Sequence, residues 1–254
     1  MPLAFSANLG FLFTEYDLPD AVRAAHRAGF KAVELHWPYA TPAADLLSAL
    51  HETDLPVLGL NTVRGDVDNG EFGLAALPGR EADARAAIDR AIPYAQAIGA
   101  TNVHVMAGRA EGEDAERTFA ENLAYACQAA DAHGMGILIE PLNTRDVPGY
   151  FLTDIAHAAD IIDRVGLPNL RIMADCYHMQ IMGGDLLTRL TQHLPKIGHI
   201  QFAAVPDRTE PDHGEIAFPW LLNALAAAGY DSPFGAEYKP RGRTEDALGW
   251  LKAF

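Results

Sequence analysis

Short apolar runs alternate with longer segments of helical periodicity along the whole chain, and the pattern repeats about every 30 residues. Strands are expected near residues 4–8, 32–36, 56–60, 102–106, 136–140, 170–174, 198–202 and 234–237. Helices are expected over 17–28, 43–53, 80–98, 113–133, 153–165, 185–193, 218–228 and 245–253. Eight strand–helix units in 254 residues predict an α/β fold, a (β/α)8 TIM barrel. No linker-like stretch divides the sequence, so a single domain over 1–254 is expected.

Helix boundaries in the sequence support this pattern. Asp17 precedes Leu18 and Pro19, and Asp154 precedes Ile155, as is typical of the first turn of a helix. Glycine follows five of the expected helices, where a left-handed residue often ends a helix: Gly29, Gly99, Gly134, Gly166 and Gly229.

Charge and cysteine content restrict the function. Lys and Arg total 19 against 34 Asp and Glu, and a formal net charge of −15 disfavours binding to nucleic acid. The two cysteines, Cys127 and Cys176, form no CxxC motif, which fits either a reducing compartment or a protein indifferent to redox conditions. The first residues lack a basic segment followed by an apolar one, and no apolar run approaches the roughly 18 residues of a membrane span. A cytoplasmic protein without a membrane partner is expected, and homo-oligomerisation only by analogy with other barrels.

Four polar residues each follow a short apolar run: Glu140, Asp175, Gln201 and Glu237. In a parallel barrel the carboxyl ends of the strands meet at one mouth, so these side chains should converge there. Three carboxylates and one amide oxygen are hard ligands, which predict a site for Mg²⁺ or Mn²⁺. Any one of these acids could instead cap the following helix, but four on successive strands favour the metal site.

Glu140 and Glu237 are the natural catalytic pair at such a site. Two glutamates that face each other across a metal-bound hydroxy-carbonyl compound could remove a proton from one carbon and return it to the next. The metal would stabilise the enediolate that forms between these two steps.

Two long loops should lie at the same mouth, 61–79 and 203–217, because loops that follow barrel strands commonly carry function. Arg208, His213 and Lys239 lie in or beside one of these loops and are candidate anchors for a substrate carboxylate or hydroxyl. Solvated surface charges are the alternative for Arg208 and Lys239.

Two histidines are further candidates for substrate contact. His178 follows Asp175 by three residues, and His104 lies at the centre of Val103–Val105. A structural role in the core remains the alternative for both. Motifs of other enzyme classes are missing, since the sequence has no phosphate loop, no nucleophile elbow and no HExxH zinc motif.

Several motifs resemble one known family, the hydroxypyruvate isomerase group of the xylose isomerase-like TIM barrels, and the resemblance covers essentially the whole chain. They are Phe5–Asn8, Ala76–Arg80, Val103–Gly108, Ile139–Asn143, Tyr177–Gln180, His199–Gln201, Pro206–Pro211, Gly214–Ile216 and Glu237–Pro240. The resemblance implies that Glu140, Asp175, Gln201 and Glu237 bind the metal, with Glu140 and Glu237 as acid and base. It also implies that His178 and Arg208 contact substrate, and Asn61 is included among the expected contacts.

The implied reaction is the interconversion of hydroxypyruvate and 2-hydroxy-3-oxopropanoate (tartronate semialdehyde). Asn61 and the segments Pro206–Arg208 and Glu210–Asp212 are more similar to 2-oxo-tetronate isomerases, so this substrate remains an alternative. A ketose 3-epimerase is less expected, because that branch usually carries a histidine where this chain has Gln201. A non-catalytic sugar-acid binding protein is the alternative outside enzymes. An apurinic-site endonuclease of the same fold is disfavoured by the acidic charge.

Overall fold

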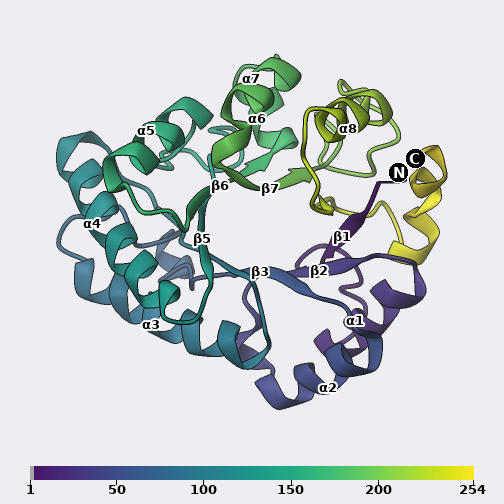
Figure 1. The fold of residues 1–254 in the computed structure, drawn as a ribbon, viewed down its shortest axis with the longest axis horizontal. Coiled ribbons are helices and arrows are strands. Elements are labelled where there is room, and N and C mark those ends of the chain that lie inside the picture. The colour runs from purple at the N-terminus through teal and green to yellow at the C-terminus, as the bar shows by residue number, and fades with distance from the viewer. Residues whose placement is uncertain (1–2) are drawn as a thin grey trace.

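The computed structural model describes residues 3–254 and contains a closed barrel of eight parallel strands, arranged in the order in which they occur in the chain (Figure 1). The barrel closes between the last strand and the first, where Phe5 pairs with Phe234. The predicted fold class is confirmed. The strands are β1 (Phe5–Asn8), β2 (Ala32–Leu35), β3 (Val57–Asn61), β4 (Asn102–His104), β5 (Gly136–Ile139), β6 (Leu170–Asp175), β7 (Ile197–Phe202) and β8 (Phe234–Ala236).

Helices surround the barrel (Figure 1). They include α1 (Leu18–Arg27), α2 (Ala43–Thr53), α3 (Glu81–Ala97), α4 (Gly112–Asp131), α5 (Ile155–Val165), α7 (Leu186–His193) and α8 (Phe218–Ala227). The predicted caps are confirmed, because the side chains of Asp17 and Asp154 accept hydrogen bonds from backbone N–H groups in the first turns of α1 and α5. The five glycines at the helix ends all have positive φ.

Two predictions about helices were incomplete or wrong. Helix α6 (Cys176–Met182) was not predicted; it is short and begins directly after the candidate ligand Asp175, whose side chain caps it. The segment 245–253 is not an α-helix but two 3₁₀ turns, η4 (Thr244–Ala247) and η5 (Gly249–Ala253). Trp250 of η5 packs edge-on against Phe5, with the ring centroids 5.1 Å apart, so aromatic packing holds this segment against the barrel.

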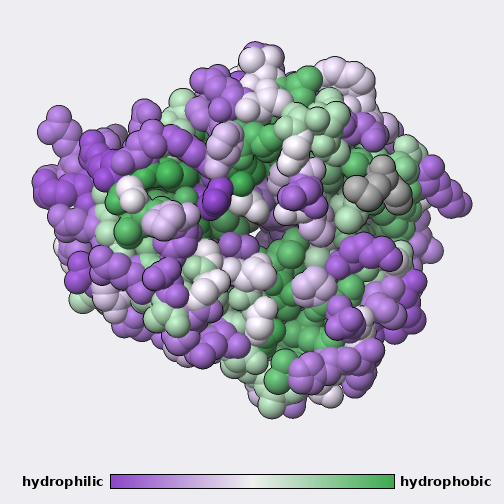
Figure 2. Space-filling model, viewed as in Figure 1, coloured by the Kyte–Doolittle hydropathy of each residue, from purple (hydrophilic) through white to green (hydrophobic). Residues whose placement is uncertain are grey.

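Strand alternation makes the interior of this barrel partly polar. Phe5 and Ala7 belong to the hydrophobic core, whereas the side chains of Ser6 and Asn8 bond to buried glutamates. Figure 2 shows a hollow near the centre of this face, bordered by hydrophilic, intermediate and hydrophobic residues, whereas hydrophilic residues dominate the outer edge. Among residues 3–254, no helix is long and apolar enough to cross a membrane.

Candidate active site

A pocket of about 280 Å³ opens at the carboxyl ends of the strands. Residues after β5, β6, β7 and β8 supply its charged side, with Glu140, His178, Arg208 and Glu237. The opposite side is largely aromatic and comes from residues that follow β1, β2 and β3: Phe11, His36, Trp37, Arg64 and Phe72.

Three buried acids meet at the base of this pocket. Glu140 follows β5, Asp175 ends β6 and Glu237 follows β8. Their exposed fractions are 7%, 0% and 5%, respectively, so water can compensate little of their charge. Glu140, Asp175 and His178 each offer one ligand atom, and these atoms lie within 4.8 Å of one another.

Arg208 partly neutralises the acids. Its Nη2 donates to Glu237 Oε2 at 2.7 Å and lies 3.4 Å from Asp175 Oδ2. The guanidinium lies 4.9 Å from the ring centroids of both Phe11 and Tyr177. Arg208 has a φ of 57°, a left-handed conformation that is uncommon for a non-glycine residue, so the loop holds this side chain in one particular place.

Glu140 and Glu237 differ strongly in their electrostatic environment. Burial raises the pKa of Glu140 well above its usual value, and the charges of Glu237 and Asp175 raise it further. Burial also acts to raise the pKa of Glu237, but Arg208 and a hydrogen bond with His36 outweigh it and lower the pKa to about 2. The pKa values of Glu140 and Glu237 are therefore shifted in opposite directions, so in the absence of a cation Glu140 holds its proton to a higher pH than Glu237 does.

Asp175 and Gln201 complete the predicted ligand set. Burial raises the pKa of Asp175 to about 8, although Arg208 opposes this shift. Gln201 lies beside Asp175 in the β6–β7 register, and its Nε2 donates to Glu34 Oε2 at 2.7 Å. Within residues 3–254, Glu140 Oε1 and Gln201 Oε1 are buried without a hydrogen-bond partner. These two features fit a divalent cation, because it would bind the unpartnered oxygens and compensate the excess negative charge.

His178 and His104 lie among these acids as neutral side chains. Burial lowers the pKa of each imidazole to about 3. The backbone N–H of Asn143 donates to His178 Nδ1 at 3.0 Å, which leaves Nε2 facing Asp175 Oδ2 at 3.7 Å. His104 Nδ1 lies 3.3 Å from Asn61 Oδ1 and 3.8 Å from Glu140 Oε2. His178, His104 and Asn61 all line the pocket.

Two candidate anchors lie outside the pocket lining. Lys239 is exposed, with its ammonium 5.9 Å from the Phe11 ring, and its backbone N–H donates to the Arg208 carbonyl. His213 lies at the surface between Asp207 and Asp212. A substrate role for either residue stays a prediction.

Sequence reasoning missed partners of Glu237 on the opposite side of the pocket. His36 Nε2 lies 2.9 Å from Glu237 Oε1, and Asn8 Nδ2 donates to the same oxygen at 2.8 Å. His36 follows β2 and Asn8 ends β1, so both carry the signal that identified the acids, a polar residue at a strand end.

Arg64 was also missed, although it lies in the long loop 61–79. Its guanidinium carbon lies 4.0 Å from the centroid of the Trp37 ring and 5.9 Å from that of Phe72. The Trp37 Nε1 donates to the Thr62 carbonyl, which holds the ring in place. Arg64 lines the pocket and, unlike Arg208, forms no ion pair with any acid of residues 3–254.

Comparisons with known proteins agree with this architecture. The family described as the xylose isomerase-like TIM barrel matches residues 22–254. A 2-oxo-tetronate isomerase of Cupriavidus necator is 47% identical over 98% of this chain and 98% of its own length. The hydroxypyruvate isomerase of Escherichia coli is 39% identical over 99% of both chains. A crystal structure from Brucella melitensis, described as an AP endonuclease of family 2, has a TM-score of 0.95 and 40% identity, and covers 100% of this chain and 99% of that one.

Fold and full-length similarity together define a barrel enzyme of the isomerase class. The chain belongs to the xylose isomerase-like TIM barrel family.

Proposed function

We propose that this isomerase interconverts hydroxypyruvate and 2-hydroxy-3-oxopropanoate. In this reaction the C3–H bond of hydroxypyruvate breaks and a C2–H bond forms, while the hydroxyl proton moves from O3 to O2. No external oxidant or reductant is needed. The proposal rests mainly on one observation: Glu140 and Glu237 line one pocket, in environments that shift their pKa values in opposite directions.

Glu140, Asp175, Gln201 and Glu237 are the residues that would hold a divalent cation, for which we propose Mg²⁺ or Mn²⁺. When bound, the cation would polarise the substrate carbonyl and stabilise negative charge on the substrate oxygens.

Proton transfer is assigned to the two glutamates. Glu237, held as a carboxylate by Arg208 and His36, takes the proton from C3, and Glu140 delivers a proton to C2. The roles reverse in the opposite direction. A cation lowers the pKa of both groups, but Arg208 and His36 contact Glu237 and so keep its pKa below that of Glu140.

Substrate binding is assigned to the two arginines in different ways. Arg208 already bonds to Glu237, so it lies near the reacting carbons. Arg64 is free of acidic partners, and its stacking on Trp37 orients the planar guanidinium, which suits it to bind a carboxylate through two hydrogen bonds. The substrate class that fits this pocket is therefore a short hydroxy acid with a carbonyl next to the carboxylate.

Proton NMR in D₂O tests the reaction. Metal-stripped protein is incubated with hydroxypyruvate before and after Mg²⁺ is added. The expected result is that 2-hydroxy-3-oxopropanoate appears, with deuterium at the new C–H position, only after the metal is present. If neither the product nor deuterium incorporation is detected after Mg²⁺ is added, the proposal is contradicted.

A four-carbon substrate is the second candidate, because the relative at 47% identity is named a 2-oxo-tetronate isomerase. The same residues would act on it, since only the carbon chain beyond C3 differs. Comparison of kcat/KM for hydroxypyruvate and for a 2-oxo-tetronate, measured with one protein preparation, decides between the two.

A further inference from the structure

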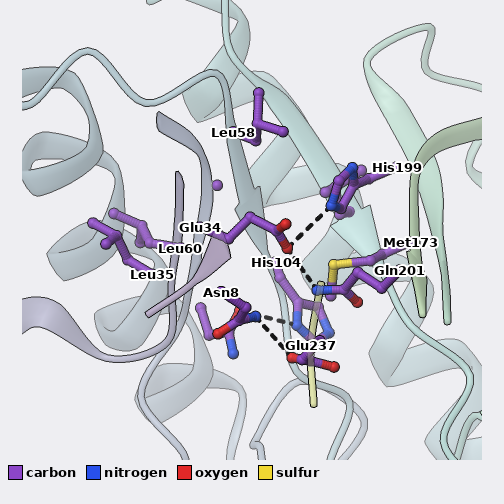
Figure 3. Close-up of a pocket in the computed structure, with 13 residues that line it drawn as sticks. Asn8, Glu34, Leu35, Leu58, Leu60, His104, Met173, His199, Gln201 and Glu237 are labelled. Atoms are coloured by element: carbon purple, nitrogen blue, oxygen red, sulfur yellow. Dashed lines mark hydrogen bonds and ion pairs between the residues drawn. The ribbon is translucent and has the colours of Figure 1, made fainter. Parts of the chain in front are cut away.

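Gln201 lies between two buried acids: it bonds to Glu34 and is the β6–β7 register partner of Asp175. Its Nε2 donates to Glu34 at 2.7 Å, whereas its Oε1 is buried without a partner among residues 3–254. Glu34, Gln201 and Glu237 line one small cavity of about 20 Å³ (Figure 3), which shares Glu237 and His104 with the lining of the substrate pocket. Glu34 does not line the substrate pocket, so the proposed reaction leaves this buried acid without a role.

Glu34 is itself firmly held. Ser6 Oγ donates to its Oε1 at 2.6 Å, and His199 Nε2 lies 3.0 Å from its Oε2. Glu34 Oε1 accepts from Ser6 and Oε2 accepts from Gln201, and since an ionised carboxylate can only accept, the group facing Oε2 must be the NH₂ end of the Gln201 amide.

Gly235 on β8 provides the space for this arrangement. A Cβ at this position would lie 2.5 Å from Glu34 Oε1, 2.7 Å from His199 Nε2 and 2.8 Å from Gln201 Cγ. Any larger residue would have to displace at least one of these three side chains, so the close approach requires glycine here.

We propose that Glu34 is a positioning residue that fixes the amide of Gln201 so that its carbonyl oxygen, not its NH₂ group, faces the metal site. An amide has one end that can bind a cation and one that cannot, and rotation by 180° exchanges them at almost no steric cost. Partners that orient metal ligands in this way typically change metal affinity by about 10–100-fold when they are removed. This inference rests on the proposed metal site.

The affinity for Mn²⁺, measured by EPR titration of substrate-free protein, tests the inference independently of activity. If the wild-type protein does not bind Mn²⁺, the proposed metal site fails. If it does, Glu34→Gln is expected to weaken binding about 10–100-fold, because the new amide can donate to Gln201 and allow it to rotate. An affinity within about twofold of wild type would overturn the role of Glu34 alone.

A second background separates orientation from simple loss of charge. In a Gln201→Glu variant the side chain presents equivalent oxygens in either orientation, so Glu34→Gln should no longer weaken Mn²⁺ binding. An equal loss in both backgrounds would contradict the inference, because a purely electrostatic effect does not depend on the asymmetry of the amide.

A matched control is Glu210→Gln, which alters another buried carboxylate, one that accepts hydrogen bonds from Arg241 and does not line the pocket. Its Mn²⁺ affinity should equal that of wild type, and a loss as large as that of Glu34→Gln would count against a specific role. If Glu34→Gln does not fold, Gly235→Ala tests the same contact. Its methyl group should displace Glu34 or Gln201 and weaken Mn²⁺ binding, and an unchanged affinity would overturn the inference.

Discussion

The two halves of the barrel face one pocket with different chemistry. The strands β5 to β8 and the loops after them supply Glu140, Arg208 and Glu237, and thus both carboxylates that line the pocket. The lining residues that come from β1 to β4 and their loops include no carboxylate. They supply aromatic rings, neutral polar groups and Arg64. In the proposed mechanism, one half would carry out proton transfer while the other would shape and orient the substrate.

Glu237 connects the two halves. Its Oε2 accepts from Arg208 of the charged half, while Asn8 and His36 of the other half bond to its Oε1. Both oxygens are therefore held, and the carboxylate has a fixed orientation toward the pocket. A substitution in either half should therefore change the environment of the Glu237 carboxylate, but to different degrees.

The largest effect is expected from the acid pair. Glu140→Gln and Glu237→Gln should each lower kcat by about 10²–10⁴-fold, because each removes a proton carrier while preserving shape. Initial rates with hydroxypyruvate measure the loss, and Mn²⁺ titration by EPR checks that the metal is still bound. A variant that keeps near wild-type turnover would show that proton transfer does not depend on the charged half.

Arg64→Ala should give the next largest effect. Loss of a charge-assisted pair with the substrate carboxylate costs about 1.5–3 kcal/mol, which corresponds to roughly a 10–100-fold rise in KM. A neutral hydroxy-ketone of similar length should show little change with the same variant. Arg208→Ala should instead lower kcat as well, because Glu237 loses its counter-charge. Equal effects on charged and neutral substrates would contradict the assignment of Arg64.

The stability of the metal-free protein should depend on pH through the charged half. The pKa of Asp175 is raised to about 8 in the folded protein, and that of Glu140 is also raised. The stability that these acids contribute is therefore complete below their pKa in the unfolded chain and is lost as pH rises through their pKa in the folded protein. His104 and His178 have pKa values lowered from 6.5 to about 3, so their effect is opposite: they make the protein more stable as pH rises from about 3 to 6.5. Of these four groups, only the two acids titrate above pH 6.5, so the Tm of metal-free protein should fall toward pH 8.

Thermal unfolding with and without Mg²⁺ measures this effect. The stabilisation by the metal should grow from pH 6.5 to 8, because the cation replaces the proton on the acids. In Glu140→Gln the pH dependence of the metal-free protein should become weaker. A Tm that stays constant over this range would show that the acids are not held in the protonated state.

Sequence patterns were sufficient to predict the architecture and the charged half. Segment length and periodicity together distinguished all eight strands and most of the helices, and an acid directly after an apolar barrel strand lies at the mouth of the barrel. Gln201 could be found in the same way, although its orientation could not. That orientation depends on Glu34, a residue far away in sequence. Its partner is determined only when the barrel closes and brings β2 near β7, with β1 and β8 between them.

The pocket residues that come from β1 to β4 and their loops were harder to predict, because their positions depend on loop conformation. Arg64 reaches the pocket because its loop turns back, with the backbone N–H of Gly73 bonded to the Arg64 carbonyl, and because Trp37 provides a face for stacking. No periodic pattern encodes either contact. Glu34 did carry a readable signal, since a charged residue inside the apolar strand Ala32–Leu35 requires a polar partner in the barrel interior.

The smallest effect is expected from the neutral contacts of β3 and β4. Asn61→Ala removes a weak interaction between Asn61 Oδ1 and His104 Nδ1, which lie 3.3 Å apart. A neutral hydrogen bond contributes about 0.5–1.5 kcal/mol, so kcat/KM should fall by roughly 2–10-fold. Asn61→Asp provides the matched test, because it adds a carboxylate to the half that has none without changing its shape. If the two halves differ as argued, Asn61→Asp should impair turnover more than Asn61→Ala, since the new carboxylate would raise the pKa of Glu140 further and repel the substrate carboxylate. A milder effect for the aspartate in steady-state assays would show that the absence of carboxylates from this half is incidental.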